Sequence, residues 1–159
     1  MLCVIALSCR KSSGPQVTLT GALTNCQGNS VCTYSYYEHA HFTGTFPQLA
    51  AGSDRVFAYK SADSSLCDYS ILLDFETSLS DNDFDITASQ IAAGHAIYAV
   101  SCPCCDFGYD PNAIGGEIKG KKIDDSHWLI NATVIVGGPS NKPVDTLVVN
   151  QYFAVQKLP

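Results

Sequence analysis

The strongest constraint on the fold is an alternation of apolar and polar residues with a period of two. In the segment 128–136 every even-numbered residue is apolar, and the segment 146–156 carries a second apolar face. Successive side chains of a strand point to opposite faces, so each segment predicts a strand with one buried face. The connector 137–143 is rich in turn-forming residues. The two segments therefore predict a long antiparallel hairpin, with residues 116–123 as its neighbour.

The same alternation recurs in shorter segments along the rest of the chain. Strands are expected at residues 17–23, 31–37, 55–60, 69–75, 84–87 and 95–101. The one expected helix, 88–93, is short, with Thr87 as its N-cap and Gly94 ending it in the left-handed conformation. About eight or nine short strands with little helix predict an all-β fold, an antiparallel β-sandwich of immunoglobulin-like architecture.

Composition and charge narrow the class of protein. Charged residues make up 15% of the 159 residues, below the roughly 25% of typical globular proteins, and strand-favouring residues take their place. The length suits a single domain with a sizeable core. The net charge of −6 repels polyanions from the average surface, so no nucleic acid partner is expected.

The N-terminal residues form a pattern of their own. An apolar run from Val4 to Leu7 is followed by Ser8, Cys9 and a basic, then small and polar stretch. A secretory signal has such an apolar core before a small-residue cleavage site. This Leu-Ser-Cys-Arg-Lys junction resembles that of small lipoproteins of the Bacteroidota type, in which the cysteine thiol carries a diacylglycerol. The alternative is a buried N-terminal strand with an ordinary cysteine at position 9.

The resemblance implies a domain organisation and a location. Residues 1–8 would be the remnant of a signal peptide, residues 9–16 the lipid-anchor cysteine and tether, and residues 17–159 a single β-sandwich domain. Lipid on Cys9 would anchor the protein in the bacterial outer membrane, outside the cytoplasm, with the periplasmic or cell-surface face left open. Proteins of this kind are often accessory binders, so a glycan or an envelope protein is the implied partner.

Six cysteines follow the anchor, and an even number in an exported domain favours disulfide bonds. The candidates are Cys26, Cys32, Cys67, Cys102, Cys104 and Cys105. The first two flank a short turn and can close a small loop. Adjacent cysteines, such as those at 104 and 105, rarely pair with each other, because a disulfide needs Cα atoms about 5.5–6 Å apart. Cys67 is therefore expected to meet one member of the cluster 102–105, with the full connectivity left open.

A metal site is the alternative use of the same cluster. It places three thiols, those of Cys102, Cys104 and Cys105, within four residues, and His95 lies seven residues upstream. Soft thiolates suit zinc or copper(I). A knuckle of the Cys-Pro-x-Cys type normally comes with a second Cys-x-x-Cys, and the chain has none. The Cys-x-x-Cys spacing within the cluster also matches a thiol-redox motif, which needs a helix N-terminus to lower the thiolate pKa.

Two other polar patterns are weaker metal candidates. His39 and His41 would point to one face of a strand, about 6–7 Å apart, as half of a zinc or copper site. The segment 81–85 has three alternate aspartates, as at the opening of a calcium loop, but the later glycine and glutamate of an EF-hand are missing. This segment is therefore either an ordinary polar turn or an irregular calcium site.

Aromatic residues gather in the first half of the chain. Tyr34, Tyr36 and Phe42 form a candidate ligand face on which sugar rings would stack, and the alternative is that alternate members are core residues. The chain has no nucleophile elbow, P-loop or Rossmann glycine pattern. We therefore expect a non-enzymatic binding, adhesion or envelope accessory module that needs no cofactor. The alternative function is a metal-handling or thiol-redox protein that uses the cluster 102–105.

Overall fold

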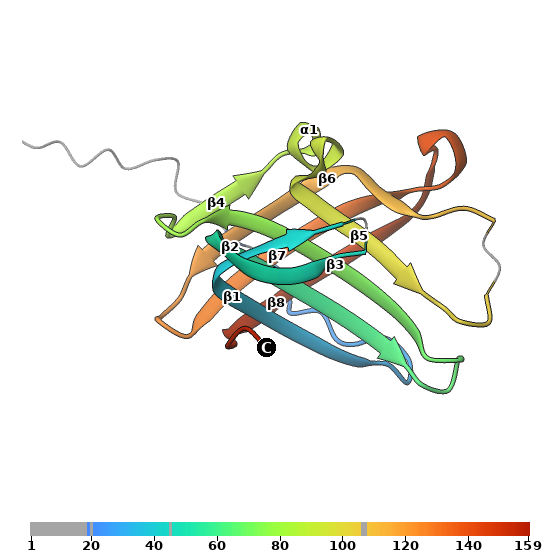
Figure 1. Cartoon of the computed structure of the whole chain (residues 1–159), viewed down its shortest axis with the longest axis horizontal. Helices are drawn as coiled ribbons and strands as arrows, with labels where there is room; N and C mark the ends of the chain where they lie inside the picture. The colour runs from blue at the N-terminus through green and yellow to red at the C-terminus, as the bar shows by residue number, and fades with distance from the viewer. Residues whose placement is uncertain (1–18, 20, 45, 106–107) are drawn as a thin grey trace, which may run out of the picture.

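The computed structural model describes residues 19, 21–44, 46–105 and 108–159, so the expected signal remnant and anchor lie outside the described residues. The fold is all-β, with eight strands and little helix (Figure 1). The elements are β1 (Val31–Thr43), β2 (Gln48–Asp63), β3 (Tyr69–Ser78), β4 (Asp83–Ile86), α1 (Ala88–Gln90), η1 (Ile91–His95), β5 (Ala96–Ser101), β6 (Asn112–Lys122), β7 (His127–Gly137), η2 (Pro139–Asn141) and β8 (Pro143–Val155).

The eight strands belong to one mixed sheet in the order β4-β6-β7-β8-β1-β2-β3-β5. Every neighbouring pair is antiparallel except β8 and β1, which run parallel and meet only at Ser35–Ala154 and Tyr36–Val155. This short junction joins two antiparallel halves, β4-β6-β7-β8 and β1-β2-β3-β5. A sandwich of two separate sheets was the expectation, whereas here one continuous sheet curls so that its two halves face each other.

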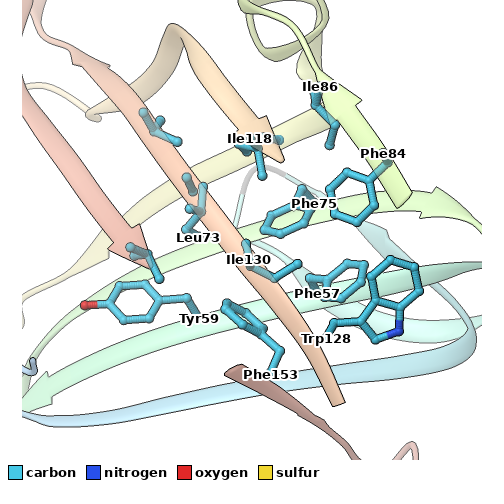
Figure 2. Close-up of a cluster of buried hydrophobic side chains, with 14 of the residues drawn as sticks. Phe57, Tyr59, Leu73, Phe75, Phe84, Ile86, Ile118, Trp128, Ile130 and Phe153 are labelled. Atoms are coloured by element: carbon cyan, nitrogen blue, oxygen red, sulfur yellow. The ribbon is translucent and has the colours of Figure 1, made fainter. Parts of the chain in front are cut away.

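The core lies between the two halves and is dominated by aromatic rings (Figure 2). Phe57 of β2 packs against rings of the opposite half, with centroids 5.4 Å from Phe84, 5.3 Å from Trp128 and 6.0 Å from Phe153. Edge-to-face and tilted pairs at such distances stabilise a core beyond their buried area alone. All five even-numbered residues of 128–136 are buried, so the alternation that predicted this strand is confirmed.

Two local predictions are also confirmed. The hairpin of β7 and β8 and the pairing of β6 with β7 are antiparallel as expected. The short helix begins after Thr87, whose backbone N–H donates to the Gln90 side chain at 2.9 Å, and Gly94 ends it with φ of +94°. A positive φ is accessible to glycine without steric cost, so local sequence decides both ends of this segment.

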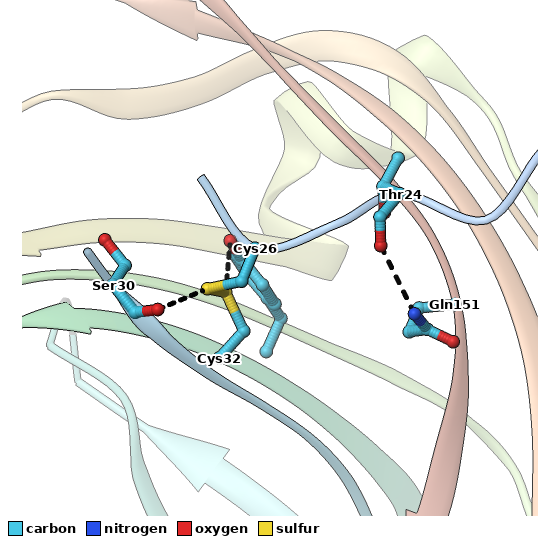
Figure 3. Close-up of a disulfide and its surroundings, with 6 residues drawn as sticks. Thr24, Cys26, Ser30, Cys32 and Gln151 are labelled. Carbon is cyan, nitrogen blue, oxygen red and sulfur yellow. Dashed lines mark hydrogen bonds between the residues drawn. A yellow bond between two sulfur atoms is a disulfide. The ribbon is translucent and has the colours of Figure 1, made fainter. Parts of the chain in front are cut away.

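The expected strand at 17–23 is not formed in its described part, because residues 21–23 belong to no strand. Residues 22–26 instead run irregularly beside β8. The Thr24 N–H donates to the Asn150 carbonyl at 2.8 Å, and the Asn150 side chain donates to the Ala22 carbonyl at 2.9 Å. This segment lies along the part of β8 that has no ladder with β1. The Cys26–Cys32 disulfide ties it to β1 (Figure 3).

The hairpin of β1 and β2 bends sharply at a bulge. The register shifts between Glu38 and Ala40, and His39 has φ of +55°. Beyond the bulge, the Phe42 N–H donates to the Glu76 carboxylate of β3 at 2.6 Å, although β2 separates β1 from β3 in the sheet. The distal hairpin, residues 41–44 and 46–51 (hereafter the flap), therefore folds over the sheet. Figure 1 shows this part of the hairpin crossing β3.

Candidate functional site

A groove of about 460 Å³ runs along the edge of the sheet at β5. β5 is the last strand in the sheet order, so one of its edges has no strand partner among the described residues. The groove is closed on one side by η1 and on another by the beginning of β6 and by the tip of the flap. The lining residues are Gly44, Phe46, Ile91, Ala92, Gly94, Ala96, Ile97, Tyr98, Ala99, Val100, Asp110, Pro111, Asn112 and Ala113.

The chemistry of the groove is apolar with a polar rim. Five consecutive residues of β5 line it, together with the half-exposed Phe46 of the flap. Asp110 is the single charged residue of the lining. Burial, and then the neighbouring Tyr69 phenol, raise the pKa of Tyr98, so its hydroxyl stays protonated and can donate a hydrogen bond. Apolar walls with a few polar groups are typical of binding sites.

The sequence patterns predicted no binding residue on β5, although one signal was present. The segment 96–100 is apolar at every position rather than alternating. A strand of that kind is covered on both faces or lies against another element. Half-buried Ile97 and Val100 flank buried Tyr98 and Ala99 on β5. A continuous apolar run in an edge strand was therefore the clue to an apolar groove.

The expected ligand face of Tyr34, Tyr36 and Phe42 is not formed. Tyr36 is fully buried, and its hydroxyl donates to the Asp125 carbonyl at 3.1 Å. The Tyr34 ring packs on the core, with its centroid 5.6 Å from that of Phe153. The even-numbered aromatic residues of β1 face inward because they share the apolar face of the strand, whereas Phe42 lies past the bulge on the flap. Tyr36 is therefore a core residue, and Tyr34 is half-buried against the core.

The six described cysteines form three pairs at disulfide geometry. They are Cys26–Cys32, Cys67–Cys104 and Cys102–Cys105, with Cα atoms 5.7, 6.0 and 5.2 Å apart. The small loop closed by the first pair and the meeting of Cys67 with the cluster were both expected. The thiol-redox alternative lacks its helix, because residues 103–104 form a turn and not a helix N-terminus.

The other expected metal ligands do not assemble. His95 and the cluster 102–105 lie at opposite ends of β5, whose six residues span about 20 Å. The bulge at His39 breaks the alternation that would have placed it and His41 on one face. Among the aspartates of the segment 81–85, Asp85 forms an ion pair with Lys119, with its Oδ2 atom 3.9 Å from the lysine Nζ. Within the described residues, Cys102, Cys104 and Cys105 are the one group of three or more such side chains close enough to share an ion.

A cluster of three polar side chains lies in the turn between β6 and β7. His127 Nδ1 is 3.1 Å from the Asp124 carboxylate and 2.9 Å from the Ser126 hydroxyl. Hydrogen bonds from the backbone N–H and hydroxyl of Ser126, followed by that from His127, lower the pKa of Asp124 to about 2. In a catalytic triad the serine and the carboxylate contact different imidazole nitrogens. Here both contact Nδ1, so the cluster stabilises a turn and has no proton relay.

Comparisons with known proteins assign no family. No family model matches the chain, and no curated protein or solved structure matches it. Among the described residues, no helix is long and apolar enough to cross a membrane.

Proposed function

We propose that this protein is a lipid-anchored, extracytoplasmic binding module of the bacterial envelope, without enzymatic activity. The observation that carries the proposal is the apolar groove along the unpaired edge of β5. An exposed strand edge offers a row of free backbone N–H and carbonyl groups to an extended segment of another chain. The apolar walls would hold alternate side chains of that segment.

An envelope protein is the preferred partner over a glycan. A sugar-binding surface needs exposed aromatic rings, whereas Tyr36 is buried in the core and Tyr34 is half-buried against it. The groove is lined mainly by aliphatic side chains and backbone groups, and Phe46 supplies its one exposed aromatic ring. These are the groups that recognise an extended apolar peptide, in which main-chain hydrogen bonds supply affinity and side-chain pockets supply specificity.

The test of the groove uses N-phenyl-1-naphthylamine, a neutral apolar fluorophore, and a set of extended peptides with alternating apolar residues. Ile97→Lys places a charge on the wall of the groove, whereas Ile123→Lys places one on the half-exposed turn after β6 and is the matched control. We expect saturable binding of the fluorophore that peptides displace, lost in the first variant and kept in the second. Equal binding by both variants would contradict the proposal.

The anchor is tested separately by labelling cells with an alkyne-bearing fatty acid. Because the thiol of Cys9 is the proposed acceptor, Cys9→Ala should abolish the label and release the protein from the membrane fraction. Cys26→Ala removes a thiol assigned to a disulfide and is the control that should keep the label. Labelling that survives Cys9→Ala would remove the anchor from the proposal and leave the groove untouched.

A further inference from the structure

Four sulfur atoms converge where the loop between β2 and β3 meets the end of β5. The Sγ atoms of Cys102, Cys104 and Cys105 all lie within 4.8 Å of one another. Cys67 reaches the same place through its bond to Cys104. The two disulfides therefore share one compact cluster of four sulfurs, in line with the expected meeting of Cys67 with the cluster 102–105.

Two β ladders place the loops that carry these cysteines at one end of β3. In the β2–β3 hairpin Asp63 pairs with Tyr69, which fixes the loop that carries Cys67. On the other side of β3, Ser70 pairs with Ser101, which fixes the residue before Cys102. Adjacent rungs of two ladders thus hold both loops at the same end of β3. Opening the disulfides would leave this placement to the sheet.

The turn at residues 102–105 has the Cys-Pro-x-Cys spacing of a metal knuckle. The Cys105 N–H donates to the Cys102 carbonyl at 3.1 Å, which closes a tight turn around Pro103. Such a knuckle supplies two thiolates and normally needs a second Cys-x-x-Cys motif. In this fold the remaining two come from Cys104 within the same turn and from Cys67 of the neighbouring loop. The missing second knuckle is thereby replaced by a tertiary contact.

We propose that Cys67, Cys102, Cys104 and Cys105 form a four-thiolate site for one Zn²⁺ ion once a dithiol reductant has opened both disulfides. Zinc–sulfur bonds of about 2.3 Å in a tetrahedron place the sulfurs about 3.8 Å apart. Three of the four sulfurs already lie within 4.8 Å of one another, so the bonded pairs only need to separate by about 2 Å. This inference does not depend on the proposed binding groove.

The redox step balances with a dithiol as the reductant. Each protein disulfide takes two electrons and two protons, so opening both converts two dithiol molecules into their disulfides and yields four protein thiols. Zn²⁺ then binds the four thiolates and releases four protons to solvent. Disulfide formation and zinc binding use the same sulfurs and exclude each other. Cys67, Cys104 and Cys105 are exposed and Cys102 is half-buried, so both reductant and ion have access.

The experiment uses the whole chain, reduced under anaerobic conditions with a phosphine that is then removed. Free thiols are counted with a chromogenic reagent, zinc is titrated against a chromophoric chelator, and Co²⁺ reports the ligand set by its absorption. Far-UV circular dichroism monitors the fold. We expect one Zn²⁺ per chain, protection of four thiols from alkylation, and the intense Co²⁺ bands of a tetrahedral thiolate site. The unreduced protein should bind neither ion.

Two variants make the ligand assignment specific. Cys67→Ser removes the ligand that the tertiary structure supplies and should weaken Zn²⁺ binding by roughly tenfold or more. The double variant Cys26→Ser with Cys32→Ser removes the distant disulfide and should leave the affinity unchanged. The proposal is overturned if reduced, folded protein binds no stoichiometric zinc, if Cys67→Ser binds zinc as tightly as the parent, or if reduction unfolds the chain and zinc does not restore its circular dichroism.

Discussion

The buried carboxyl group of Asp74 gives the sharpest quantitative prediction. Asp74 lies on β3, on the face opposite to the core residues Leu73 and Phe75, and only 6% of it is exposed. Its Oδ1 accepts no hydrogen bond from any described residue. Burial disfavours the charged form, and it raises the pKa of Asp74 from 3.8 to about 7. In the unfolded chain the same carboxyl group titrates near its ordinary value.

The sign of the effect follows from proton binding. Between pH 3.8 and about 7 the folded protein keeps a proton on Asp74 that the unfolded chain has lost. The free energy of unfolding therefore falls as the pH rises, by about 1.4 kcal/mol per pH unit. Over this window the loss amounts to about 4 kcal/mol. Below the window the buried group carries no such penalty.

The perturbation is Asp74→Asn, which keeps the shape of the side chain and removes its titration. We expect the variant to gain stability over the parent protein as the pH rises, by about 4 kcal/mol between about pH 4 and about pH 8. The assay is urea unfolding at each pH, followed by the fluorescence of Trp128, which is the single tryptophan of the chain. Asp83→Asn on β4 controls for the loss of one negative charge. A stability difference that stays constant across this pH range would refute the reasoning.

Two further predictions concern the scaffold. Replacing Cys67 and Cys104 by alanine removes a link with a sequence separation of 37 and should lower the unfolding free energy by about 4 kcal/mol in urea titrations. Removing the Cys26–Cys32 link, with a separation of 6, should lower it by about 2 kcal/mol. A larger loss from removing Cys26–Cys32 would contradict the chain-entropy argument. Arg55→Lys should cost about 3 kcal/mol and shift the Trp128 emission, because the guanidinium donates to three backbone carbonyls and lies 4.5 Å from the Trp128 ring centroid. Unchanged stability and emission would show that this contact is not needed.

The burial of the aromatic residues of β1 could not be predicted from the sequence. Alternation places Tyr34 and Tyr36 on one face of β1, and the structure agrees. Whether that face meets solvent or core depends on what lies opposite. Phe57 of β2 packs on Tyr36, and Phe153 of β8 packs on Tyr34. These contacts join residues distant in sequence, so no local pattern distinguishes a ligand face from a buried one.

The sequence alone determined the features whose causes are local. Period-two alternation defined β7 and β8, and turn chemistry joined them as a hairpin. Thr87 and Gly94 bounded the short helix. Each depends on residues only a few positions apart, whose backbone preferences act before any tertiary contact forms.

Only the tertiary structure decided the features that depend on contacts between distant parts of the chain. The parallel junction of β8 with β1, the flap folded over β3, and the choice of Cys104 as the partner of Cys67 all depend on distant segments. Their formation is selected by the packing of the whole core, because each distant contact has a loop-closure cost that it cannot offset by itself. The apolar groove arises from such contacts and was the part of this protein that the sequence could least predict. The meeting of Cys67 with the cysteine cluster, in contrast, had a signal in the cysteine spacing.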